Sequence, residues 1–258
     1  MSKRLWTLFL IALLIALPGA AHAASPAGAA SAGGLSIDFS GGGLFTDRMM
    51  QIIALVTVLS VAPSILIMMT SFVRIVVVLS LLRTALGLQS SPPNSVIVSL
   101  ALFLTLFVMT PTLKDAYSQG IEPLIANKIT TEQAFDAAAV PMKKFMLGHV
   151  RQSDLKLFLD MSGSKAPATP EAVPLTTIAP AFMLSELKRA FEIGFLIFVP
   201  FLIIDMAVAS ILMSMGMMML PPVIISLPFK LIFFVLVDGW RLISGSLIES
   251  YMHGPPPG

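Results

Sequence analysis

Long apolar segments alternate with polar stretches along this chain. The apolar segments cover Met49–Val73, Val96–Leu113, Ile193–Leu220 and Val223–Val237. Hydropathy alone therefore predicts four membrane spans. The connection that holds Arg74 and Arg83 is basic, so the positive-inside rule places it in the cytoplasm.

Prolines interrupt every one of these apolar segments. A proline inside a helix removes one backbone hydrogen bond and kinks the helix. This pattern favours helical hairpins that pack against copies of themselves over a simple bundle of four spans. We therefore expect an all-α membrane protein, built of proline-kinked helical hairpins that assemble into a helical, ring-like oligomer. The interrupting residues are Pro63, Pro111, Pro200, Pro221, Pro222 and Pro228.

The first 23 residues have the pattern of a secretory signal peptide. Basic Lys3 and Arg4 precede an apolar run, and the small residues Ala21 and Ala23 form a cleavage site. Cleavage after Ala23 would place the new N-terminus outside the cytoplasm. An uncleaved first span is the alternative. Residues 24–47 are rich in Gly, Ala and Ser and are expected to form a flexible leader.

The remaining chain divides by hydropathy into two hairpins and an insert. We expect a first membrane-type hairpin over 48–113, a polar helical insert on the periplasmic side over 114–185, a second hairpin over 186–250 and a short tail over 251–258.

Two helices are predicted within the insert. Thr130 and Gln133 have the spacing of a capping box, so the first helix should run from Thr131 to about Met146, bent or divided by Pro141. The second should cover about 153–161, followed by an extended connection through the prolines of 165–180. The carboxylates of Asp136, Asp154 and Asp160 are interpreted as solvated, because nothing near them suggests catalysis.

Four charged residues lie in or beside the last two apolar segments: Asp205, Lys230, Asp238 and Arg241. A charge that faces lipid costs at least ~2.5 kcal/mol, so these side chains should face protein or water. They form either a proton or ion relay that titrates at Asp205, or ion pairs that hold subunits together.

A second charged group precedes the third apolar segment: Glu186, Lys188, Arg189 and Glu192. The spacing of Glu186 with Arg189 and of Lys188 with Glu192 permits pairing along one helix. The group is either a collar at the membrane interface or a set of contacts between subunits.

Methionines cluster where the third and fourth apolar segments meet: Met213, Met215, Met217, Met218 and Met219. Methionine is unbranched and deformable, which suits an apolar seal that closes on itself and yields to objects of varied shape. Core filling within a hairpin is the alternative interpretation.

Composition narrows the function. Hydrophobic residues make up 56% of the chain and charged residues 12%, which is typical of a membrane protein. Without Cys, and with only three scattered His, the chain offers no clustered metal ligands. Removing Lys3 and Arg4 from the 16 basic residues leaves as many as the 14 acidic ones, which gives no support for a nucleic-acid partner. We expect neither enzymatic activity nor a cofactor.

Several long strings resemble the FliP family of the bacterial flagellar type III export gate. They are SELKRAFEIGF, PFLIIDMAVASILMSMGM, MMMLPP, SLPFKLIFFVLVDGW and, upstream, PSILIMMTSFVRIVVVLSLLRTALGLQSSPPNSVIVSLALFLTLFVMTP. The resemblance covers about Leu44 to Ser250 and is far more specific than a short motif.

The resemblance implies a core pore-forming subunit that conducts unfolded flagellar proteins across the inner membrane. It implies a homo-oligomer, a pentamer, that associates with FliQ and FliR in an assembly raised largely above the membrane plane, with FlhA, FlhB and the assembly factor FliO as further partners. It places the chain as a multi-pass protein of the bacterial inner membrane, in contact with lipid, within the flagellar basal body and partly facing the periplasm. It also assigns Met217, Met218 and Met219 to a gasket that seals the closed channel.

Two alternatives remain. The chain could serve a virulence-associated injectisome, although the signal peptide and leader resemble the flagellar branch. It could also be a proton- or ion-coupled multi-pass transporter that uses Asp205, although its two hydrophobic halves show no inverted repeat.

Overall fold

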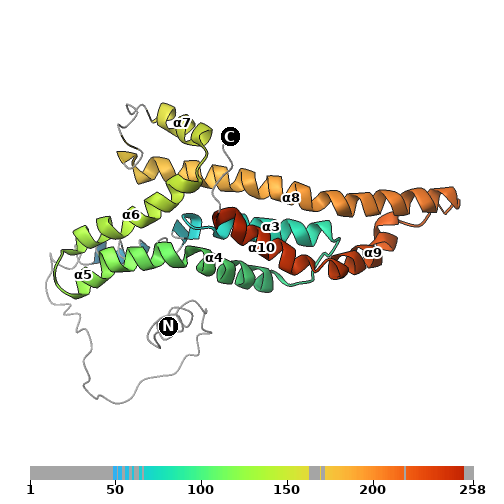
Figure 1. Cartoon of the computed structure of the whole chain (residues 1–258), viewed down its shortest axis with the longest axis horizontal. Helices are drawn as coiled ribbons and strands as arrows, with labels where there is room; N and C mark the ends of the chain where they lie inside the picture. The colour runs from blue at the N-terminus through green and yellow to red at the C-terminus, as the bar shows by residue number, and fades with distance from the viewer. Residues whose placement is uncertain are drawn as a thin grey trace, which may run out of the picture. The chain divides into compact units, whose positions relative to one another are not determined.

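Figure 1 shows the computed structural model of the chain, which describes residues 49–50, 52–53, 56–57, 60, 64–65, 67–162, 169, 172–217 and 219–252. The predicted signal peptide with Ala21 and Ala23, the leader and Met218 lie outside the described residues. The chain divides into two compact units, Met1–Ile52 and Ile53–Gly258. Every contact given below lies within the second unit.

All regular structure in the described residues is helical, which confirms the prediction of an all-α fold. The helices are α3 (Phe72–Ala85), α4 (Asn94–Ala116), the π-helical turn η1 (Tyr117–Ile121), α5 (Glu122–Ile125), α6 (Thr131–His149), α7 (Gln152–Met161), α8 (Leu175–Ser214), α9 (Pro222–Leu236) and α10 (Gly239–Met252).

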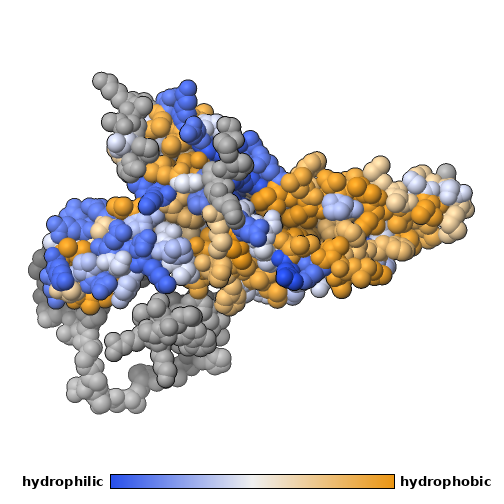
Figure 2. Space-filling view, viewed as in Figure 1, coloured by the Kyte–Doolittle hydropathy of each residue, from blue (hydrophilic) through white to orange (hydrophobic). Residues whose placement is uncertain are grey.

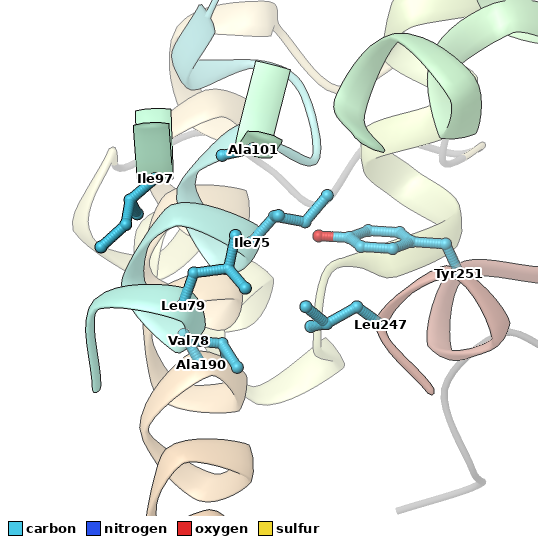
Figure 3. Packing of buried hydrophobic residues seen from close by; sticks show 8 residues of the cluster. All are labelled: Ile75, Val78, Leu79, Ile97, Ala101, Ala190, Leu247 and Tyr251. Carbon is cyan, nitrogen blue, oxygen red and sulfur yellow. The ribbon is translucent and has the colours of Figure 1, made fainter. Parts of the chain in front are cut away.

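The main core forms where α3 lies between α8, α4 and α10 (Figure 3). Its buried side chains come from all four helices: Ile75, Val78 and Leu79 of α3, Ala190 of α8, Ile97 and Ala101 of α4, and Leu247 and Tyr251 of α10. Gly194 allows α3 to approach α8 closely, because a Cβ at this position would lie 2.2 Å from Leu81 Cδ1. Segments far apart in sequence are thus held together by apolar burial.

The insert has the two helices that the sequence predicts. At the start of α6 both capping-box hydrogen bonds form, between Thr130 Oγ1 and the Gln133 N–H and between Gln133 Oε1 and the Thr130 N–H. Helix α6 continues to His149, and α7 covers Gln152–Met161, so these predictions are confirmed. Pro141 does not divide α6, since the helix runs through it with Pro141 buried.

Helices α4 and α8 cross the prolines that were expected to limit them. Helix α4 continues through Pro111 to Ala116. Helix α8 begins at Leu175, so the expectation of an extended connection as far as residue 180 is wrong. Pro174 directly precedes the helix, a position where a missing N–H costs little. The side chains of Ile178, Ala181 and Phe182 around Pro180 are fully buried, and this burial outweighs the lost backbone hydrogen bond.

Two of the described helical stretches are long and apolar enough to cross a membrane, Asn94–Ile125 and Leu175–Ser214. The pair α9 and α10, bent by 61°, would make a third if it were one span. The expected span Met49–Val73 lies partly outside the described residues. The 40 residues of α8 rise about 60 Å, which is twice the ~30 Å thickness of a bilayer core.

The surface of this unit changes character along α8. Figure 2 shows mostly hydrophilic residues over α6 and α7 and mostly hydrophobic residues over the C-terminal half of α8. Large apolar side chains of α8, among them Phe195, Leu196 and Ile203, are exposed in the single chain. An apolar surface of this extent requires lipid or protein to cover it.

A polar cluster around the buried Asp154 joins α7 to α8. Arg151 donates two hydrogen bonds to Asp154, from Nε to Oδ2 at 2.9 Å and from Nη2 to Oδ1 at 2.8 Å. The Ser185 hydroxyl of α8 donates to Asp154 Oδ2 at 2.7 Å and accepts from the Arg151 N–H at 3.0 Å. The Arg151 side chain, and then the Ser185 hydroxyl, hold the pKa of Asp154 below its ordinary value, although burial acts in the opposite direction.

We predict that Asp154→Asn destabilises the purified protein at pH 7, because a charge-assisted hydrogen bond contributes about 1.5–3 kcal/mol. A carboxylate with a lowered pKa stabilises the fold above its ordinary pKa, and that contribution is lost as the pH falls through the lowered value. The difference in melting temperature between wild type and variant should therefore shrink on acidification below about pH 3.9. The exposed Asp136 of α6 supplies the control, Asp136→Asn. If the melting temperatures of wild type and Asp154→Asn differ by the same amount at pH 7 and at pH 3, the proposed role of the Asp154 charge is contradicted.

Candidate functional site

The Met-bearing turn between α8 and α9 follows a defined helix ending. Gly216 has φ 73°, in the left-handed region, and directly follows the C-cap residue Met215. The Gly216 N–H donates to the Met213 carbonyl at 3.1 Å, and the Met217 N–H donates to the Leu212 carbonyl at 3.0 Å. This pair of bonds is a Schellman motif, which ends the helix. Pro221 and Pro222 then begin α9, where their missing N–H groups cost little.

The described methionines of this turn are exposed. We call residues 213–219 the Met loop. Met219 is 98% exposed, and Met213, Met215 and Met217 are also exposed in the single chain. The loop carries no charged side chain. Its described methionines therefore form an apolar, deformable tip that the described part of the chain does not cover.

Two of the four charged residues in or beside the last two apolar segments, Asp205 and Lys230, meet at the base of this hairpin. The Lys230 Nζ of α9 donates to Asp205 Oδ2 of α8 at 2.6 Å and to the Ala85 carbonyl of α3 at 3.3 Å. The hydroxyl of Ser226 donates to Asp205 Oδ1. Lys230 is 4% exposed, whereas the Asp205 side chain is 32% exposed. We call Asp205, Ser226, Lys230 and the Ala85 carbonyl the clamp.

The other two charges lie apart from the clamp, at the bend between α9 and α10. Asp238 has φ 51°, and its carboxylate lies 3.9 Å from Arg241 Nη1. Both side chains are largely exposed. A Cβ on the next residue, Gly239, would lie 2.2 Å from the Phe234 ring, so a larger residue there would displace that buried ring.

The charged group at the centre of α8 divides into a buried and an exposed part. Glu186 is fully buried and forms a bidentate pair with Arg74 of α3, in which the Arg74 Nε lies 2.8 Å from Glu186 Oε2. The hydroxyl of Tyr251 also donates to Glu186. Arg74 stacks over the Tyr251 ring, 3.9 Å from its centroid, and donates to Ser250 at 3.1 Å.

Glu186 therefore pairs with Arg74 and not with Arg189. Among the described residues, the Nε of Arg189 is buried and has no hydrogen-bond partner. Lys188 and Glu192 lie 3.7 Å apart on the exposed side of α8. An exposed pair of this kind contributes little to stability.

Four polar residues around these pairs received no such role in the sequence analysis: Arg74, Ser185, Ser226 and Tyr251. The interpretation of Asp154 as solvated is wrong, since it is 6% exposed, whereas Asp136 and Asp160 are exposed as expected. The sequence did contain a signal that Arg74 is paired, because an arginine inside an apolar run needs a buried partner. No group of three or more potential metal ligands occurs within the part of the chain that the structure describes.

We predict that Glu186→Gln destabilises the protein by about 3–5 kcal/mol, because it leaves the buried charge of Arg74 unpaired. The measurement is the melting temperature and protease resistance of the purified protein. Glu192→Gln, which breaks an exposed pair on the same helix, should change stability by about 1 kcal/mol or less. Equal effects of the two substitutions would refute this interpretation of Glu186.

Comparison with known proteins covers the same region. A profile of the FliP family matches residues 55–247. The chain is 58% identical over 243 residues to the flagellar biosynthetic protein FliP of Caulobacter vibrioides, covering 94% of this chain and 91% of that protein. It is 57% identical over 201 residues to that of Bacillus subtilis, covering 78% and 91%. It is 48% identical over 244 residues to the flagellar biosynthetic protein FliP of Agrobacterium fabrum, covering 93% of this chain and 97% of that protein. The Met loop and both buried pairs of α8 with α3 and α9 lie within the matched region, and the chain belongs to the FliP family.

Proposed function

We propose that this chain is the core pore-forming subunit of the flagellar type III protein export gate. It conducts unfolded flagellar proteins across the inner membrane, and the Met loop seals the closed channel. The observation that carries the proposal is the exposed, uncharged Met loop at the end of a hairpin, in a chain whose relatives are named flagellar biosynthetic proteins.

The seal works by apolar contact. Several copies surround a central channel, and their Met loops project inward as a ring of thioether side chains that excludes ions and small solutes. A passing unfolded chain displaces these side chains, which re-pack around it without specific hydrogen bonds. A channel that conducts many different sequences needs such non-specific contact, because an apolar ring does not select for particular side chains.

The length and surface of α8 support an assembly that rises out of the membrane. Its rise of about 60 Å exceeds the bilayer core, and its apolar side chains are exposed in the single chain. Other copies of this chain, in a pentamer, would cover much of that surface. FliQ and FliR complete the gate, and FlhA, FlhB and FliO act with it. The chain itself is a structural subunit without catalytic activity, located in the inner membrane within the flagellar basal body and partly facing the periplasm.

We predict that an export substrate stalled in transit crosslinks to a cysteine placed in the Met loop, at Met218 or Met219. The chain has no native cysteine, so the background is clean. The crosslink should disappear when the export signal of the substrate is deleted. A cysteine at the exposed Asp136 of the insert is the control and should not crosslink. If substrates stall, as confirmed by a second probe, and no loop position crosslinks, the loop is not on the protein-conducting path.

We also predict that the double substitution Met217→Ser and Met219→Ser raises the resting leak of ions several-fold. The reason is that hydroxyls admit water into an apolar constriction. The double substitution of the same residues with Leu should keep the seal and slow export, because branched side chains deform less. Ion flux into vesicles that contain the purified assembly measures the leak. A serine variant that leaks no more than wild type would contradict the seal.

A further inference from the structure

At the C-terminus of α3, the carbonyl of Ala85 accepts no hydrogen bond from a backbone N–H of the described residues. The turn that ends α3 uses the carbonyls of Leu82, Arg83 and Thr84, which accept from the N–H groups of residues 86, 88 and 87. The next carbonyl, that of Ala85, accepts from Lys230 Nζ at 3.3 Å. The last carbonyls of a helix carry a partial negative charge and favour a cation. Lys230 thus caps a helix that lies 145 residues away in sequence.

Moving Lys230 out of this position costs a large free energy, because its charged group would lose its partners. It is 4% exposed, and its charge is balanced by Asp205 at 2.6 Å. The second oxygen of Asp205 accepts from Ser226, one turn before Lys230 on α9. Any separation of these groups leaves a buried ammonium group unpaired in apolar surroundings, which is strongly unfavourable. The clamp therefore fixes α8, α9 and the end of α3 relative to one another.

The clamp lies at the base of the hairpin that carries the Met loop. Asp205 precedes Met215 by ten residues, and Lys230 follows Leu220 by ten residues. Ten helical residues rise about 15 Å. Between Asp205 and Lys230, over the described residues of 206–229, only Leu212 and the clamp residue Ser226 are buried, so this part of the hairpin receives little support from the rest of its own chain. The clamp therefore sets the direction in which this part of the hairpin points.

We infer that Lys230 is a positioning residue for the seal: by capping α3 and pairing with Asp205, it fixes the direction in which the hairpin presents the Met loop. This inference rests on the proposed function only for its consequence, the closed channel. The positioning itself is a property of one chain and can be measured separately.

Four variants separate the two bonds of Lys230. Lys230→Met keeps the length of the side chain and removes both bonds. Lys230→Arg keeps the cation. The exchange Asp205→Lys with Lys230→Asp permits an ion pair between α8 and α9, but the shorter carboxylate at position 230 has no proton to donate to the Ala85 carbonyl. Lys188→Met removes a cation from an exposed pair of α8 and is the control.

The test is the distance between spin labels on Thr84→Cys, at the exposed end of α3, and Met219→Cys in the loop. The absence of native cysteines permits specific labelling, and labelled chains are diluted among unlabelled ones in the purified assembly, so that only distances within one chain are measured. We expect one narrow distribution of label-to-label distances in the wild type, in Lys230→Arg and in Lys188→Met. We expect a distribution at least twice as broad, or displaced, in Lys230→Met and in the charge exchange.

A narrow, unshifted distribution in Lys230→Met would overturn the inference. If Lys230→Met does not assemble, the charge exchange decides, because it keeps the ion pair and loses only the cap. A narrow distribution there shows that the cap has no positioning role. The resting ion leak of the same samples then tests the consequence. If the distance distribution of Lys230→Met is displaced but its ion leak is unchanged, the positioning role of the clamp stands and the seal is refuted. If the Met-loop variants leak but the distance distribution of Lys230→Met stays narrow and unshifted, the seal stands and the positioning role of the clamp is refuted.

Discussion

The cost of removing a charge from water determines how this chain is held together. In the part of the chain that the structure describes, the buried charged side chains are Arg74, Asp154, Glu186 and Lys230, and each has an oppositely charged partner. Each of the three resulting pairs involves α8 or lies against it. Glu186 joins α8 to α3, Asp205 joins it to α9, and Ser185 joins it to the insert. Helix α8 is thus the common partner of every buried pair.

The same helix connects the two regions of contrasting chemistry. Its first half packs against the polar insert and against α3, where most of the buried side chains lie. Phe201 in its second half still packs against α3 and α9. Beyond Asp205 the helix leaves that support and ends at the Met loop, with large apolar side chains exposed. A surface of this kind suits contact with further copies and with lipid. An apolar, deformable tip that is fixed at its base and unsupported beyond it suits a seal that must yield and close again.

Local patterns could be predicted from the sequence, whereas pairings over long distances could not. The capping box at Thr130 and Gln133 predicts the start of α6 because the signal lies within four residues. Glu186 was expected to pair with Arg189 by the same local logic, but its partner is Arg74, 112 residues earlier, which no periodicity reveals. Prolines were also poor guides to helix ends, since burial of Ile178 and Phe182 holds α8 together around Pro180. The Met loop was visible as a cluster in the sequence, while the clamp required the fold.

The proposed seal requires that the Met loops of several copies meet on one axis. A reconstruction by electron cryo-microscopy of the assembly, purified from membranes without export substrate, measures this directly. Our account predicts that residues 213–219 of each copy converge on the symmetry axis and close it, with the Asp205–Lys230 pair at the base of each hairpin. Met loops that point outward to lipid or to the periphery, with an open axis or with no common axis, would contradict it.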